Sequence, residues 1–339
     1  MRLHGVVSDL RVPLSILDLA PIPRGGTVSE TLEASVALAQ LAERLGYERV
    51  WYAEHHNVPS IASSATSVLI AHVGAHTQTI RLGAGGIMLP NHSPLMIAEQ
   101  FGTLAALHPG RIDLGLGRAP GSDQVTQRAL RRGPQAADEF PHDVLELQGY
   151  FAGQSRLPGV QAIPGKGADV PLYILGSSLF GAQLAAALGL PYAFASHFAP
   201  QALMPALEVY RRDFRPSSQL DHPYVIVGAN VVAADSVEDA HQQVDVTRRL
   251  RAVTLFGQGR EYSDELADAL LAAGASAQID AMLTYTAIGT RDDVRTFLTG
   301  FAEQTGADEI ITAHHSPTTA QRLHSVTLLA EAMALAPTP

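Results

Sequence analysis

The chain has 339 residues, 46% of them hydrophobic, and a formal net charge of -10, which suits a large α/β core and disfavours a nucleic-acid partner. It contains no cysteine, which excludes disulfides, a thiol nucleophile and thiolate-bound metals. No apolar run reaches the ~18 residues of a membrane span and no signal-peptide pattern precedes Asp9, so no membrane partner and a cytoplasmic protein are expected.

In chain order, apolar segments alternate with amphipathic ones. The segments that read as buried strands are 14–18, 49–53, 80–89, 112–116, 171–175, 192–195, 224–233 and 309–313. The first helix is marked by Thr27 and Glu30, which have capping-box spacing, and ends at Gly46. Eight β–α units predict a (β/α)₈ barrel that forms a single domain over residues 1–339, rather than an open sheet.

One long stretch interrupts this alternation. Residues 255–280 combine glycines, acidic residues and an Ala/Gly/Ser run without clear periodicity. Long insertions between barrel elements are commonly functional lids or disordered segments. We therefore expect a mobile lid near residues 255–280.

The strand at Val50 to Ala53 continues directly into Glu54, His55 and His56. Active sites of parallel barrels are built at the carboxyl ends of the strands. Adjacent strand residues point to opposite faces, so only one of the two histidines can face the barrel axis. At this point a catalytic histidine and a pair of structural loop histidines are both open.

A metal site is the main rival interpretation. Later strand ends carry His92, His197 and the pair His314-His315, but the first strand ends without the His-x-His pattern of barrel hydrolases. We expect no metal and keep a metal hydrolase as an alternative.

Three further strand ends suggest a ligand. Glycines at 83, 85 and 86 predict a bulge, an unusual peptide or a flat ligand on the backbone, with a plain barrel kink as the alternative. Arg118 follows the fourth strand and suits an anion, unless it forms a surface salt bridge. Ser177 and Ser178 open a helix whose N-terminus suits a phosphate, although Ser178 could be an ordinary cap.

Taken together, the order of these motifs resembles the bacterial-luciferase-like flavin monooxygenases, in a subgroup without light emission. The resemblance covers roughly residues 14–332, and the matching segments are 17–21, 53–57, 86–92, 115–121 and 176–178. It implies a (β/α)₈ homodimer, with early helices at 62–76 and 94–107 in the interface. It also implies reduced FMN from a separate flavin reductase, and O₂ that forms a C4a-hydroperoxyflavin.

By the same resemblance, His55 is the catalytic base. Arg118 and Ser178, with Ser177 beside them, are the contacts of the FMN phosphate. Ala84, Gly85 and Gly86 form the strand beside the flavin ring, with a cis peptide expected at Gly85-Gly86. His197 lies where the light-emitting subunit has an aromatic residue over the flavin.

The chain also departs from that subunit. Gly117 stands in place of its reactive cysteine, which makes luciferase activity doubtful. We expect a small hydrophobic organic substrate, with a role in tailoring secondary metabolites such as polyketides. The mouth is expected to be lined by Asp18, Ile61, Met88 and Phe198 together with the lid. A dehydrogenase dependent on the deazaflavin F420 and a non-catalytic flavin-binding protein remain alternatives.

Overall fold

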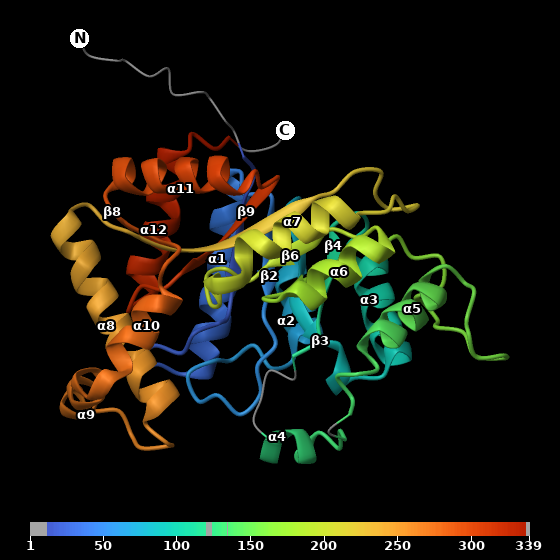
Figure 1. The fold of residues 1–339 in the computed structure, drawn as a ribbon, viewed down its shortest axis with the longest axis horizontal. Helices are drawn as coiled ribbons and strands as arrows, with labels where there is room; N and C mark the ends of the chain where they lie inside the picture. Colours follow the sequence, from blue (N-terminus) through green and yellow to red (C-terminus); the bar gives the residue numbers. More distant parts are fainter. Residues whose placement is uncertain (1–11, 120–123, 134, 337–339) are drawn as a thin grey trace, which may run out of the picture.

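A computed structural model describes residues 12–119, 124–133 and 135–336. Parallel strands in this part of the chain close into a barrel, because β6 pairs with β7 and β9 pairs with β1 (Figure 1). The eight barrel strands are β1 (Leu14–Asp18), β2 (Arg49–Tyr52), β3 (Arg81–Met88), β4 (Ile112–Gly117), β5 (Leu172–Gly176), β6 (Tyr192–Phe194), β7 (Val225–Ala233) and β9 (Glu309–His314). The predicted (β/α)₈ barrel is confirmed, each strand lying within a residue of its expected place.

One short strand, β8 (Thr286–Gly289), was not predicted. It pairs in parallel with the carboxyl-terminal half of β7, from Asn230↔Thr286 to Ala233↔Gly289, outside the ring of eight. Four residues with a glycine at the end give too little periodicity to distinguish a strand from a loop. Pairing with the long β7 decides its conformation.

Helices surround the barrel (Figure 1). The described helices are α1 (Val28–Leu45), α2 (Thr66–Gly74), α3 (Pro94–Leu107), α4 (Gln124–Ala129), α5 (Phe140–Phe151), α6 (Leu179–Leu188), α7 (Leu203–Asp213), α8 (Val237–Phe256), α9 (Asp264–Leu270), α10 (Ser276–Met282), α11 (Arg291–Thr305) and α12 (Thr319–Ala332). Thr27 and Glu30 form the predicted capping box of α1, and Gly46 ends that helix in the left-handed conformation.

The insertion at 255–280 is largely helical outside the loop at 257–263, which corrects the prediction of an irregular stretch. It comprises the end of α8, then α9, a π-helical turn at Leu271–Ala275 and α10. Ion pairs of Arg249 with Asp268 and of Arg248 with Asp280 join α9 and α10 to α8. Short apolar runs without clear periodicity hid these helices, and their movement as a lid stays a prediction.

The amino-terminal half of the barrel interior is filled by a buried charge network. The Arg49 guanidinium binds the carboxylates of Glu309 and Asp113, at 2.9 and 2.7 Å, and the hydroxyl of Tyr173. Tyr224 also donates to Glu309, and Trp51 donates its indole N–H to Asp113. Because these groups satisfy one another, they occupy this end of the barrel, and a ligand site belongs at the opposite end.

No described helix is both long and apolar enough to cross a membrane.

Candidate functional site

His55 is positioned by the alternation of β2. Trp51 and Ala53 pack into the apolar cluster inside the barrel, whereas Val50 and Tyr52 pack into the outer core beneath the helices. His55 lies two residues after Ala53, so the same alternation directs it toward the barrel interior. It interacts electrostatically with His197, just after the end of β6. Of the two neighbouring histidines, His55 is therefore the one at the barrel mouth.

Glu54 points the other way and organises the outer rim. Its carboxylate is buried and accepts hydrogen bonds from Nε2 of His56 at 2.9 Å, from Nε2 of His92 at 2.8 Å and from the Met88 backbone N–H at 3.0 Å. Burial raises the pKa of Glu54, but these donors outweigh burial and the net pKa is lowered. Glu54 thus ties the end of β2 to the end of β3 as an ionised carboxylate; sequence reasoning did not single it out.

The backbone of β3 changes course at the predicted place. The Gly85-Gly86 peptide is cis, and the register between β3 and β4 shifts between Ala84 and Ile87. A side chain on Gly85 would collide with Trp51 and Leu17, and one on Gly86 would collide with the Gly115 backbone. The predicted unusual peptide is confirmed, and close packing of neighbouring strands explains the glycines.

Arg118 and the amino end of α6 come together beside β4 and β5. The Arg118 guanidinium lies 4.2 Å from the centre of the Phe180 ring in the first turn of α6. Ser178 is the N-cap residue but makes no side-chain capping bond, and Ser177 beside it is exposed. Free hydroxyls, unpaired helix N–H groups and a nearby guanidinium form a set that suits a phosphate.

His197 lies at the end of β6 against the backbone of β7. A Cβ on Gly228 would lie 2.2 Å from Nδ1 of His197, so the glycine provides the space for the imidazole. Nδ1 is buried and has no hydrogen-bond partner. Burial, with the nearby charges of Arg251 and His55, lowers the pKa of His197 to about 4, so the ring is neutral at pH 7.

The predicted residues therefore share one end of the barrel. Most of them directly follow the carboxyl ends of β2, β4, β5 and β6, and the glycine segment lies within β3 between them. In that order they are His55, then Ala84, Gly85 and Gly86, then Arg118, then Ser177 and Ser178, then His197. This arrangement can hold a long ligand with an anionic end near β4 and β5 and a reacting part near His55.

One expected mouth residue does not belong there. Asp18 is fully buried and binds the Arg322 guanidinium at 2.6 Å, the Ser35 hydroxyl and the Ala20 backbone N–H. It therefore fixes β1 against α1 and α12. Its position as the last residue of a short strand gave no sign that distant Arg322 would pair with it.

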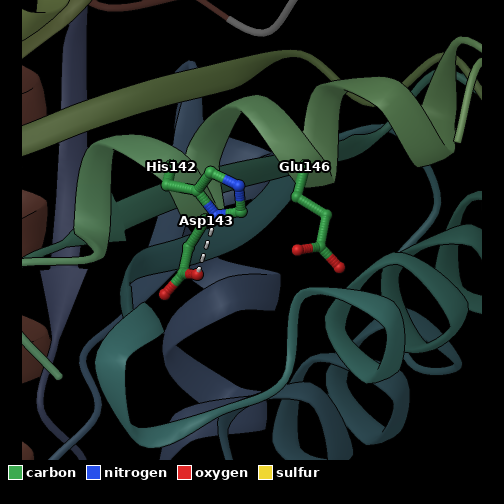
Figure 2. Close-up of side chains that lie close together, drawn as sticks. All are labelled: His142, Asp143 and Glu146. Atoms are coloured by element: carbon green, nitrogen blue, oxygen red, sulfur yellow. Dashed lines mark ion pairs between the residues drawn. The ribbon is translucent and has the colours of Figure 1, made fainter. Parts of the chain in front are cut away.

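The histidines of the metal alternative are engaged separately. His92 binds Glu54, whereas His314 is buried and bonded to Ser325 through Nδ1. Among the described residues, the group close enough to hold a metal is His142, Asp143 and Glu146 on α5 (Figure 2). They come from a single helix rather than from strand ends, so they give no support to a hydrolase at the barrel mouth.

A parallel barrel with polar side chains gathered at the carboxyl ends of its strands is typical of an enzyme. Comparison with known proteins identifies the family. The profile described as luciferase-like monooxygenase matches residues 12–309, and the chain belongs to this family. It is 47% identical to the luciferase-like monooxygenase of Escherichia coli K12, over 95% of this chain and 97% of that protein. It is likewise 47% identical to the uncharacterized protein YvbT of Bacillus subtilis, over 94% and 96% of the two chains.

Other matches carry information on activity and structure. The chain is 35% identical to the N-acetyl-S-alkylcysteine monooxygenase of Bacillus subtilis, over 85% of this chain and 88% of that one. The crystal structure of apo-MsnO8 superposes with a TM-score of 0.85 at 36% identity, over 96% of this chain and 100% of that one. Membership of the luciferase-like monooxygenase family and the monooxygenases among these relatives support a monooxygenase activity.

Two more distant structures share the fold. The FMN complex of the oxygenating constituent of 3,6-diketocamphane monooxygenase from Pseudomonas putida has a TM-score of 0.68 at 16% identity, over 96% and 99% of the chains. An F420-dependent secondary alcohol dehydrogenase has a TM-score of 0.72 at 16% identity, with the same coverage. At this identity they establish the barrel alone.

Proposed function

We propose that this monooxygenase uses reduced FMN and O₂ to oxygenate a small, largely hydrophobic organic substrate. The observation that carries the proposal is the ordered arrangement of His55, the Ala84-Gly85-Gly86 backbone and the anion-binding set of Arg118 and Ser178 around one barrel mouth. In our proposal a separate reductase supplies the reduced FMN.

The residues present fit FMN. Arg118, Ser177 and Ser178 offer a guanidinium, hydroxyls and helix N–H groups to a phosphate, as that dianion requires. Ala84 to Gly86 would lie beside the isoalloxazine ring. Bound FMN would supply the electrons and the oxygen activation that no amino-acid side chain provides.

The chain's own part is to place a proton and to exclude water. His55 would hold or donate a proton beside the reacting atoms, a role for which histidine suits neutral pH. His197, which lies near His55 at the end of β6, is neutral and would take no part in this proton transfer. The helices of the 255–280 insertion would cover the mouth; Tyr262 already contacts Arg24 of the loop after β1, 5.1 Å from guanidinium to ring.

For the substrate we begin with the class named in the 35%-identical relative, an N-acetyl-S-alkylcysteine. Such a thioether combines an apolar alkyl group with a polar head. Ile61, Met88 and the exposed Phe198 remain the proposed apolar lining. A role in secondary metabolism and a cytoplasmic location stay predictions.

The first experiment is stopped-flow absorbance of the protein premixed anaerobically with reduced FMN and then mixed with oxygenated buffer. We expect a spectral species distinct from both reduced and oxidised FMN, which delays the return of oxidised FMN. Return of oxidised FMN at the rate of free flavin would contradict the proposal. Difference spectra with F420 then test the deazaflavin dehydrogenase, and binding without turnover would favour a non-catalytic flavin-binding protein.

We predict that His55→Ala keeps FMN affinity within about twofold but lowers substrate oxygenated per FMN reoxidised by ~10²–10⁴-fold, because the proton donor or acceptor is lost. Affinity is measured by quenching of Trp51, the single tryptophan, and coupling by product analysis. His222→Ala, an exposed histidine in the loop before β7, is the control. Normal coupling in His55→Ala would rule out this role.

A further inference from the structure

A partly buried arginine on α8, Arg251, is unexplained by the site described above. The NH1 atom of Arg251 is buried and has no hydrogen-bond partner, and no carboxylate among the described residues pairs with this guanidinium. The two other arginines in this part of α8 differ: Arg248 pairs with Asp280 and Arg249 with Asp268. Arg251 is therefore the member of the group that is turned away from the acidic residues of α9 and α10.

Arg251 faces the end of the barrel between β6 and β9. It interacts electrostatically with His197 at the end of β6 and with His315 just after β9. The Thr247 hydroxyl, one helical turn before Arg251, donates to the His315 carbonyl at 2.8 Å and fixes α8 against this loop. The hydrogen bond of Thr247 therefore fixes the part of α8 that carries Arg251 beside the barrel mouth.

Other polar atoms near this end also lack partners. Nδ1 of His197, the Ser316 hydroxyl and Oδ1 of Asn230 are buried without a hydrogen bond. Native proteins contain few buried polar atoms without a hydrogen bond, and such an atom is commonly satisfied by a ligand or a water molecule. Arg251 carries a positive charge that no carboxylate of the described residues pairs with, and the neutral His197 and the Ser316 hydroxyl can donate hydrogen bonds beside it, so the ligand that these groups best accommodate is an anion.

A partly buried guanidinium whose NH1 atom is removed from water and has no partner is unfavourable, because nothing offsets the desolvation of that atom. A bound carboxylate would offset it through charge-assisted hydrogen bonds to the guanidinium. The phosphate set of Arg118 and Ser178 lies at β4 and β5, a different part of the ring from the β6, β7 and β9 ends around Arg251. A second anionic group, not the FMN phosphate, therefore fits here.

We propose that Arg251 binds a carboxylate of the organic substrate, with the Ser316 hydroxyl and the His197 imidazole as further polar contacts. This inference rests on the proposed function and narrows it: the substrate is an organic acid with an apolar part that reaches toward His55. Arg251 is then a specificity-determining residue, contributed by the helix that leads into the insertion.

The test compares an acid with its neutral ester. N-acetyl-S-benzyl-L-cysteine, its methyl ester and the minimal carboxylate phenylacetate are titrated calorimetrically into FMN-loaded protein. We expect the wild type to bind the acid at least tenfold more tightly than the ester. Arg251→Gln should weaken acid binding at least tenfold and leave ester binding within twofold, whereas Arg251→Lys should show an intermediate loss.

Arg249→Gln, on the exposed side of the same helix, is the matched control and should bind the acid like the wild type. Equal affinity of wild type for acid and ester, failure to bind either carboxylate, or unchanged acid affinity in Arg251→Gln would overturn the proposal. So would a loss of FMN affinity in Arg251→Gln, since Arg251 would then serve the cofactor.

Two readouts separate the possible failures. If the wild type binds FMN and delays its reoxidation but shows no binding of the carboxylic acids, the proposed carboxylate site is wrong and the monooxygenase proposal stands. If FMN is not handled at all, the proposed function itself fails. The melting temperature of Arg251→Gln should equal or exceed that of the wild type, because an unpaired, partly buried charge is removed. A marked decrease would assign Arg251 a structural role and overturn the inference.

Discussion

At the scale of single residues, the site depends on how Glu54, His55 and His56 divide their roles. Alternation along β2 directs His55 to the mouth, while Glu54 and His56 bond to each other on the outer side. The same buried carboxylate binds His92 and the Met88 backbone. Glu54 is thus the residue that holds the ends of β2 and β3 in place around the proposed flavin site.

We predict that Glu54→Gln lowers the free energy of unfolding at pH 7 by about 1–3 kcal/mol, because charge-assisted hydrogen bonds from buried donors are lost. The pKa of Glu54 is lower in the folded protein than the usual 4.5, so its contribution is complete above that pH. It is lost as the pH falls through the folded-state pKa.

Urea unfolding at several pH values measures this difference. The gap between wild type and Glu54→Gln should therefore shrink on acidification below about pH 4.5. Glu303→Gln, exposed on α11, is the control and should change stability little. A gap that is constant with pH would show that packing, rather than the carboxylate charge, is what Glu54 contributes.

At the scale of elements, the ends of β6 and β7 fit together through Gly228. The Ser196 hydroxyl donates to the Gly228 carbonyl at 2.6 Å, and the His197 ring fills the space where a Cβ would lie. The Asn230 side chain then donates to the His197 carbonyl at 2.8 Å. These contacts fix His197 between the barrel and Arg251.

We predict that Gly228→Ala lowers the free energy of unfolding by about 1–3 kcal/mol, because its Cβ overlaps His197. Adding His197→Ala should recover part of the loss, which a double-mutant cycle of thermal or urea unfolding measures. Gly300→Ala, in open space on α11, should be neutral or stabilising by up to ~1 kcal/mol. Fully additive effects at 228 and 197 would contradict this account.

At the scale of the whole molecule, the homodimer expected from the family resemblance remains a proposal. Neighbouring helices α2 and α3 expose Val68 and Met96, at 68% and 56% of their surface. Exposed apolar side chains on adjacent helices suit a contact with a second copy of the chain.

We predict that the double variant Val68→Glu and Met96→Glu shifts the protein from dimer to monomer, because the contact would bury two like charges. Sedimentation velocity over a range of concentrations measures the shift. Val237→Glu, an exposed apolar residue on α8, should leave the assembly unchanged. A monomeric wild type, or a dimer that survives the double change, would contradict the proposal.

The sequence by itself determined the barrel. Strand segments were recognisable because buried parallel strands are continuous apolar runs, and the helix ends because caps such as Thr27 and Gly46 act locally. It also indicated where the residues of the proposed flavin site lie, since strand ends in a barrel converge on one face. The cis Gly85-Gly86 peptide was expected from the family motif.

Tertiary structure alone decided the rest. The helices of the insertion and strand β8 form against α8 and β7, so their local sequence carried little signal. Asp18 was misplaced at the mouth because its partner Arg322 lies 304 residues away in the chain. Arg251 was missed for the same reason. A helical arginine can pair with exposed acidic residues or point into the molecule, and which of the two occurs depends on contacts between distant segments. The local sequence pattern does not contain that information.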